Sequence, residues 1–174
     1  MTAPSWLAPL VSAAGTVGVD DLTRFVPPND ASRRSAVLVL FGEGRAGPDV
    51  LIIERAHDMR SHAGQPAFPG GAIDEVDDGP VSAALREAAE ETGLDPSGVD
   101  VLAVLPDLWV PPSGFVVTPV LGWWREPSPI TVLDPAEVAS VHRVPLSELT
   151  DPANRFLVRH PSGYEGAAFG VRDL

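Results

Sequence analysis

A glycine pair followed by an acidic helical segment is the sequence feature that limits the possible folds of this chain most strongly. Gly70 and Gly71 form the pair, and Glu87, Glu90 and Glu91 follow at helical spacings of three and four residues. Residues with this spacing lie on one side of an α-helix, so the glutamates are expected to form one acidic surface. Like charges so close repel each other unless something neutralises them. A hard divalent cation such as Mg²⁺, which binds oxygen ligands, is the first candidate.

The sequence around these glutamates predicts an α-helix that begins at Pro80 and ends just before Gly93. Proline suits the first helical turn, and glycine suits the left-handed position after a helix. The residue that caps the helix is expected to be Asp77, Asp78 or Gly79. One flank carries the apolar residues expected to face the core, which are Val81, Ala84, Leu85 and Ala88.

Short apolar runs elsewhere in the chain predict strands. The predicted strands are residues 35–41, 49–54, 101–105, 115–124 with an interruption at Pro119, 141–144, 155–158 and 167–169. The first two are expected to pair as a hairpin across a turn at residues 42–48, and the last two as a second hairpin. Short helical segments are predicted at residues 6–11 and 145–149.

Strands, one long helix and then more strands are typical of an α+β fold with a mixed central sheet. We expect residues 1–34 to form an N-terminal helical segment and linker, broken at residues 27–30, and residues 35–174 to form the main domain. The last residues carry no helical pattern, so we expect the fold to lack a closing C-terminal helix.

Composition excludes several classes of function. The 174 residues include no cysteine, which excludes disulfides and thiolate zinc sites. The formal charge of −12 repels a phosphate backbone and argues against nucleic-acid binding. No run of about 18 apolar residues is present, so we expect no membrane span. The N-terminus lacks a basic segment before an apolar one, which favours a cytoplasmic location.

The segment from Gly71 to Leu94 resembles the Nudix box, G-x5-E-x7-R-E-U-x-E-E-x-G-U, in which U is aliphatic. The register matches at Gly71, Arg86, Glu87, Glu90, Glu91, Gly93 and Leu94. Asp77 stands where the box has its first glutamate, and one extra residue separates it from Arg86. Alternatively, Asp78 takes that position. We prefer Asp77, because the insertion then falls in the turn before the helix.

The residues before the box resemble the extended signature of the coenzyme A pyrophosphatase branch of this family, L-L-T-x-R-S/A-x3-R-x3-G-x3-F-P-G-G. Its positions are matched by Leu51, Arg55, Ala56, Arg60, Gly64, Phe68, Pro69, Gly70 and Gly71. Weaker matches to the same branch follow at residues 113–119 and around Glu137.

This resemblance implies a Nudix-type α/β/α sandwich that hydrolyses a diphosphate bond in a nucleoside diphosphate derivative, with Mg²⁺ or Mn²⁺ as cofactor. Glu87 and Glu91 would be the main metal ligands, and Glu90 would add a ligand or a water-mediated contact. Arg86 stands four residues before Glu90 and would pair with it and hold it in place. Glu137 would be the general base, with Glu90 as the second candidate.

The same resemblance implies where the substrate binds. Arg55 and Arg60 would hold phosphate groups, Gly70 would permit a close backbone approach, and Ser113 would line the substrate site. The branch implies coenzyme A or an acyl derivative as substrate, giving 3′,5′-ADP and 4′-phosphopantetheine. Two alternatives stay open, namely a pyrophosphatase for NADH or ADP-ribose and a non-catalytic ligand sensor. A small nucleotide is thus the expected partner, and the tryptophans and N-terminal segment are compatible with a homodimer.

Each assignment has a plainer interpretation. An acidic run on a helix is usually a solvated face, and here only the glycine pair, Arg86 and the upstream signature outweigh that interpretation. Arg55 and Arg60 fit surface ion pairs as well as phosphate contacts, and Glu137 fits the start of a helical turn. A sensor would be expected to lose the box glutamates, whereas this chain has all three.

Overall fold

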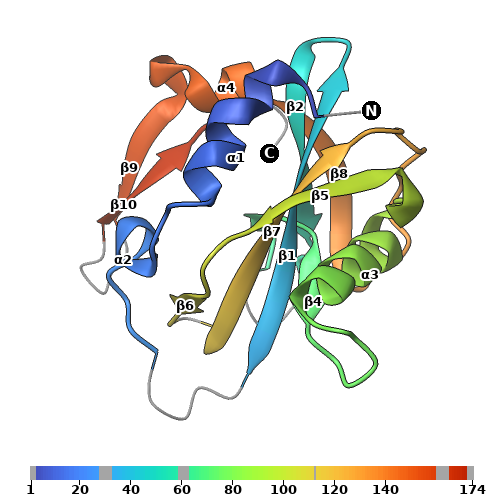
Figure 1. Cartoon of the computed structure of the whole chain (residues 1–174), viewed down its shortest axis with the longest axis horizontal. Coiled ribbons are helices and arrows are strands. Elements are labelled where there is room, and N and C mark those ends of the chain that lie inside the picture. The colour runs from blue at the N-terminus through green and yellow to red at the C-terminus, as the bar shows by residue number, and fades with distance from the viewer. Residues whose placement is uncertain (1–2, 28–32, 59–62, 112, 160–164, 172–174) are drawn as a thin grey trace.

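A mixed central sheet forms the framework of the protein (Figure 1). The computed structural model describes residues 3–27, 33–58, 63–111, 113–159 and 165–171. Among these residues, one sheet contains β1 (Arg34–Gly44), β2 (Gly47–Arg55), β3 (Pro66–Ala67), β4 (Gly70–Ala72), β5 (Val99–Val104), β6 (Leu108–Val110), β7 (Phe115–Trp124) and β8 (Val138–Pro145). The order is β3-β2-β1-β7-β5, with β4 paired to β1, β6 to β7 and β8 to β2. β1 and β7 run parallel and the other pairs antiparallel, which confirms the predicted α+β fold.

Helices cover both faces of this sheet (Figure 1). The helical elements are η1 (Ser5–Leu7), α1 (Ala8–Ala14), α2 (Val19–Leu22), α3 (Pro80–Thr92), η2 (Pro96–Gly98), α4 (Leu146–Thr150) and η3 (Pro152–Asn154). The long helix α3 packs on one face through Ala84 and Ala88. Leu7 of η1 is buried on the opposite face, where Leu146 and Leu149 of α4 also pack. The arrangement is the predicted α/β/α sandwich.

β1 is apolar at successive positions because both of its faces are covered. Leu38 and Leu40 join the core beneath α3, whereas Val39 and Phe41 join the core beneath the N-terminal helices. Successive side chains of a strand point to opposite faces, so a central strand in a sandwich needs apolar residues at both.

The predictions for the first turn and for Pro119 were wrong. The turn expected at residues 42–48 is confined to residues 45–46, because β1 and β2 stay paired as far as Gly44 opposite Gly47. Pro119 does not interrupt its strand but lies inside β7. Proline has no N–H to donate, and here it contributes its carbonyl, which accepts a hydrogen bond from the N–H of Leu105 (2.9 Å).

Helix α3 begins and ends where the sequence predicts. Pro80 occupies its first position, and Gly93 follows its end in the left-handed conformation (φ 71°). The N–H of Gly93 donates to the carbonyl of Ala89 (2.9 Å). Gly79 is the N-cap, and no side chain caps the helix there. Asp77 is therefore free for another partner.

The chain after α4 forms a separate antiparallel hairpin of β9 (Arg155–Arg159) and β10 (Glu165–Phe169), as predicted. No α-helix follows Thr150 among the described residues. The predicted break at residues 27–30 falls mostly outside them. No helix in the described part of the chain is both long and apolar enough to cross a bilayer.

Candidate active site

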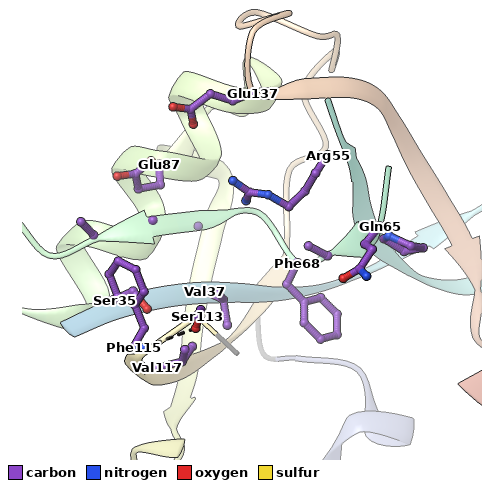
Figure 2. A pocket seen from close by; sticks show the side chains of 15 residues that line it. Ser35, Val37, Arg55, Gln65, Phe68, Glu87, Ser113, Phe115, Val117 and Glu137 are labelled. Atoms are coloured by element: carbon purple, nitrogen blue, oxygen red, sulfur yellow. Dashed lines mark hydrogen bonds between the residues drawn. The ribbon is translucent and has the colours of Figure 1, made fainter. Parts of the chain in front are cut away.

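A cavity of about 480 Å³ opens where β4, α3 and the loop after β2 meet (Figure 2). Its lining comes from widely separated segments, namely Ser35, Val37, Arg55, Gln65, Pro66, Ala67, Phe68, Gly70, Gly71, Ala72, Glu87, Ser113, Phe115, Val117 and Glu137. Figure 2 shows Glu87 and Glu137 at one end, with the Arg55 guanidinium pointing toward them. Phe68 and Phe115 lie on the side away from these carboxylates. The cavity thus has an acidic end and an apolar end.

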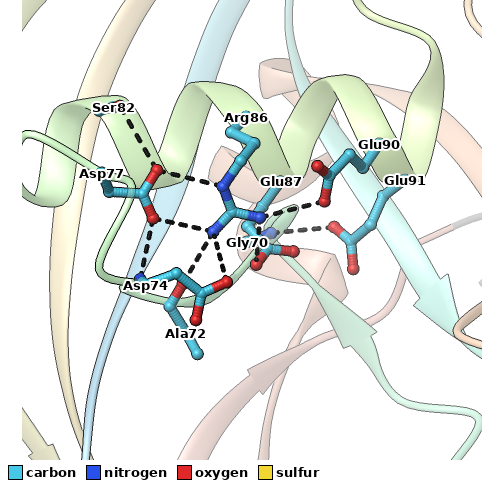
Figure 3. A network of polar contacts seen from close by, with 9 residues as sticks. All are labelled: Gly70, Ala72, Asp74, Asp77, Ser82, Arg86, Glu87, Glu90 and Glu91. Atoms are coloured by element: carbon cyan, nitrogen blue, oxygen red, sulfur yellow. Dashed lines mark hydrogen bonds and ion pairs between the residues drawn. The ribbon is translucent and has the colours of Figure 1, made fainter.

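Arg86 connects the carboxylates of the acidic end through a network of polar contacts (Figure 3). Its Nε donates to Oδ1 of Asp77 (3.1 Å) and its Nη2 donates to Oδ2 of the same carboxylate (2.9 Å). Its Nη1 donates to Glu87 and to Glu90, at 3.0 Å each, and its Nη2 also reaches the carbonyl of Ala72 (3.1 Å). The predicted contact with Glu90 is present. The bidentate partner is Asp77, which agrees with the preferred register of the box.

This pairing shifts the pKa of both partners. Hydrogen bonding to Arg86 lowers the pKa of Asp77 to about 2, and the N–H of Asp74 is bonded to the same carboxylate. The hydrogen bond to Asp77 in turn raises the pKa of Arg86 above its ordinary value. Both groups therefore stay charged, and a bidentate pair of this kind fixes the orientation of both side chains.

Glu91 lies inside the protein rather than on its surface. The residue is 2% exposed, and its Oε2 accepts a hydrogen bond from the N–H of Gly70 (2.9 Å). Its Oε1 is buried without a hydrogen-bond partner among the described residues. Burial raises the pKa of Glu91 to about 7, although the Gly70 bond and the charge of Arg55 act in the opposite direction.

Glu87 lies against the backbone of the glycine pair. A Cβ on Gly71 would come within 2.4 Å of the Glu87 carboxyl carbon, so only glycine leaves room for that carboxylate. A Cβ on Gly70 would meet the carbonyl oxygen of Ala36 at 2.2 Å. Burial raises the pKa of Glu87, and Arg86 partly offsets this effect.

Glu90 is more exposed to solvent than Glu87 and Glu91. Its side chain is 60% exposed, compared with 15% for Glu87, and its carboxylate turns back to Arg86. The spacing of the three glutamates predicted one acidic surface, and this prediction was wrong, because their exposures differ. β4 passes over one part of the helix face, so Glu91 becomes buried while Glu90 stays in solvent.

Glu87 and Glu91 have the chemistry of ligands for a hard cation. Among the described residues, no three acidic or histidine side chains are already grouped as a metal site. The unpartnered Oε1 of Glu91 nevertheless needs an electropositive partner, because a buried carboxylate oxygen without one is costly. The charge of Glu137 also contributes to the raised pKa of both glutamates, so three carboxylates share one region. A divalent cation fits this donor set.

The other predicted site residues are distributed unevenly. Arg55, Gly70, Ser113 and Glu137 all line the cavity. The hydroxyl of Ser113 donates to the carbonyl of Val110 (3.1 Å), so it also shapes the turn before β7. Arg60 lies outside the described residues, and its predicted contact with phosphate stays a prediction.

Sequence reasoning missed the apolar end of the cavity. Phe68 and Phe115 belong to segments matched by family signatures, but neither was assigned a role. Val37 and Val117 were predicted only as strand residues. An apolar residue in a strand has the same local pattern whether it faces a cavity or a packed core, so no local signal separates the two.

Solved structures with the same fold support this architecture. The Nudix hydrolase RenU from M. smegmatis aligns with a TM-score of 0.55 and 24% identity, covering 66% of this chain and 71% of that protein. The NUDIX domain of Shewanella oneidensis NrtR, complexed with ADP ribose, aligns with a TM-score of 0.55 and 22% identity, covering 77% and 86%. At such identities the likeness concerns the fold alone.

Curated relatives are more similar in sequence. The "Uncharacterized Nudix hydrolase NudL" of Cronobacter sakazakii is 46% identical over 116 residues, which is 67% of this chain and 59% of the relative. The protein of the same name from Escherichia coli K12 is 41% identical with the same coverage. The chain thus spans about three fifths of the length of these relatives. The NUDIX domain family profile matches residues 31–162, which include every candidate site residue. The chain belongs to the Nudix domain family.

Proposed function

We propose that this protein is a metal-dependent hydrolase that cleaves the diphosphate bond of a nucleoside diphosphate derivative. The observation that carries the proposal is the acidic end of the cavity, where Glu87 and Glu137 lie near the buried, incompletely bonded Glu91. Arg55 points to the same end. Carboxylates for a cation and an arginine for phosphate oxygens are the groups that diphosphate hydrolysis requires.

The proposed reaction is attack by water on one phosphorus of the diphosphate. A bond forms between the water oxygen and that phosphorus, the bridging P–O bond breaks, and each product keeps one phosphate. Glu137 is our candidate for accepting the proton from water, because its exposed carboxylate lines the cavity. Glu90 is the second candidate, although its carboxylate is bonded to Arg86.

Glu87 and Glu91 are the proposed main metal ligands. Glu90 would add a water-mediated contact to the metal. A bound Mg²⁺ or Mn²⁺ would offset the charge of the diphosphate and lower the pKa of water. Arg86 holds Glu87 in place, and the N–H of Gly70 orients Glu91. These contacts keep the carboxylates ordered in spite of their mutual repulsion.

Coenzyme A or an acyl derivative is our proposed substrate. The residues of the coenzyme A signature support it, because Arg55, Phe68, Gly70 and Gly71 all line the cavity. The apolar end suits a nucleobase or another weakly polar group beside the charged diphosphate.

A substrate panel tests this proposal. The full chain would be incubated with coenzyme A, NADH or ADP-ribose, each with Mg²⁺ or Mn²⁺, and the products identified by mass spectrometry. We expect 3′,5′-ADP and 4′-phosphopantetheine from coenzyme A, and no turnover with EDTA. Faster cleavage of NADH or ADP-ribose would favour those substrates instead, and inactivity on all three would favour a ligand sensor.

A further inference from the structure

Arg33 lies over an aromatic ring that lines the apolar end of the cavity. Its guanidinium carbon is 4.1 Å from the centroid of the Phe115 ring, and Phe115 lines the cavity. The carbonyl of Arg33 accepts a hydrogen bond from the N–H of Val116 (2.9 Å), which fixes its backbone beside β7. A cation–π contact of this kind holds the charge next to the ring.

The neighbouring Arg34 is engaged differently. Its guanidinium pairs with Asp107 (2.6 Å), and Asp107 also accepts a hydrogen bond from the hydroxyl of Thr118 (2.6 Å). In the described part of the chain, no carboxylate forms an ion pair with Arg33. The exposed Arg33 does not itself line the cavity, but its guanidinium places a positive charge beside the Phe115 ring, in a chain whose formal charge is −12.

The two ends of the cavity match different parts of one ligand. The acidic end with Arg55 suits a diphosphate together with a cation. At the other end, the Phe115 ring and Val117 form an apolar surface on which a nucleobase can stack, as bases do on aromatic side chains. A guanidinium beside such a surface recognises an anionic oxygen cluster, and phosphate suits it best.

We propose that Phe115 and Arg33 form a nucleotide subsite that recognises an additional phosphate on the ribose, outside the diphosphate that is cleaved. This inference rests on the proposed function, because coenzyme A carries a ribose 3′-phosphate whereas NADH and ADP-ribose carry none. Phe115 holds the base, and Arg33 makes the site selective for the substrate with the extra phosphate.

Binding of two nucleotides tests the subsite without any turnover. Adenosine 3′,5′-bisphosphate and AMP differ by the 3′-phosphate alone, and their affinities for the full chain can be measured by isothermal titration calorimetry with Mg²⁺ present. We expect the wild-type protein to bind the bisphosphate about three- to tenfold more tightly, in keeping with a partly exposed charged contact. Arg33→Gln should reduce this preference to less than about twofold.

Two further variants separate the roles. Arg34→Gln removes the adjacent positive charge but should keep the preference, because Arg34 is paired with Asp107. Phe115→Leu should lower the affinity for both nucleotides by similar factors, because both carry the same base. A preference that survives in Arg33→Gln, or that disappears equally in Arg34→Gln, would overturn the assignment.

Failure of the proposed subsite can be distinguished from failure of the proposed substrate. A protein that hydrolyses coenzyme A but binds both nucleotides equally overturns the subsite and leaves the proposed function standing. A protein that prefers the bisphosphate but does not cleave coenzyme A supports the subsite and overturns the proposed substrate. Failure of the wild-type protein to bind either nucleotide at millimolar concentration also overturns the subsite.

Discussion

Arg86 holds the carboxylate of Asp77 at both oxygens, with Nε 3.1 Å from Oδ1 and Nη2 2.9 Å from Oδ2. The pair ties the turn before α3 to the middle of that helix. Because the guanidinium also reaches Glu87, the turn is coupled to a proposed metal ligand. The hydrogen bonds of Arg86 thus connect the turn before α3 to the proposed metal site.

Asp77→Asn should destabilise the protein and disturb the site. The amide keeps the shape of the side chain but loses the charge, and only its oxygen, not its nitrogen, can accept a hydrogen bond from Arg86. We expect a lower Tm by thermal denaturation and a reduced turnover number. Asp78→Asn is the matched control. Because Asp78 is exposed, this substitution should leave the Tm and the turnover number nearly unaltered. Equal effects of the two substitutions would contradict the importance of the Arg86 pair.

Glu91→Gln should abolish most metal-dependent turnover while the fold stays intact. We expect a loss of at least about a hundredfold in kcat, on the scale known for changes close to bound metals. Glu90→Gln should lose no more than about fivefold, because its exposed pair with Arg86 is a weak contact. Steady-state kinetics with circular dichroism would check both variants. A comparable loss in Glu90→Gln would instead make Glu90 a ligand or the base.

The metal-free protein should become less stable as pH rises from about 4.5 to above 7. The pKa of Glu91 is raised in the folded state to about 7, from 4.5. A raised pKa means that its stabilising contribution is full below pH 4.5 and is lost as pH rises through 7. On linkage grounds the loss is on the order of 3 kcal/mol. Tm measured against pH in EDTA should show this slope, and Glu91→Gln should flatten it. An unchanged slope in that variant would assign the effect to another group.

Gly71→Ala should lower activity more than stability. The new Cβ would lie 2.4 Å from the Glu87 carboxyl carbon and would displace that carboxylate. A shift of about 1 Å in a catalytic group can reduce rate on the order of a hundredfold, so we expect a loss between tenfold and a hundredfold. Gly15→Ala is a suitable control, since its Cβ would approach other atoms no closer than 3.6 Å. Normal kinetics in Gly71→Ala would argue that Glu87 is not a ligand.

Leu7→Ala should destabilise the whole domain, because Leu7 is 1% exposed in the core with Phe41 and Trp123. Removing such a side chain typically costs about 2–4 kcal/mol. Leu10→Ala removes the same atoms from a residue that is 39% exposed, and should have a much smaller effect. Urea denaturation of the two variants would compare them. Similar midpoints would show that the N-terminal helix adds little to the main domain, which we predict from residue 35 onward.

Local signals in the sequence predicted much of the fold. The bounds of α3 follow from Pro80, Gly93 and the helical periodicity between them, and these are interactions between near neighbours. The hairpin of β1 and β2 and the final hairpin follow from apolar runs on either side of a turn. The Pro119 prediction failed because the backbone bonds that a proline must satisfy depend on which strands flank it.

Local sequence decides which carboxylates, arginines and glycines share a helix or a turn in this protein. The packing of distant segments places the adjacent Glu90 and Glu91 in opposite environments, because β4 covers Glu91 and leaves Glu90 in water. It also brought Arg33 onto Phe115 through the parallel pairing of β1 and β7. Burial and cavity lining depend on contacts between residues far apart in the chain, and periodicity within one segment carries no information about them.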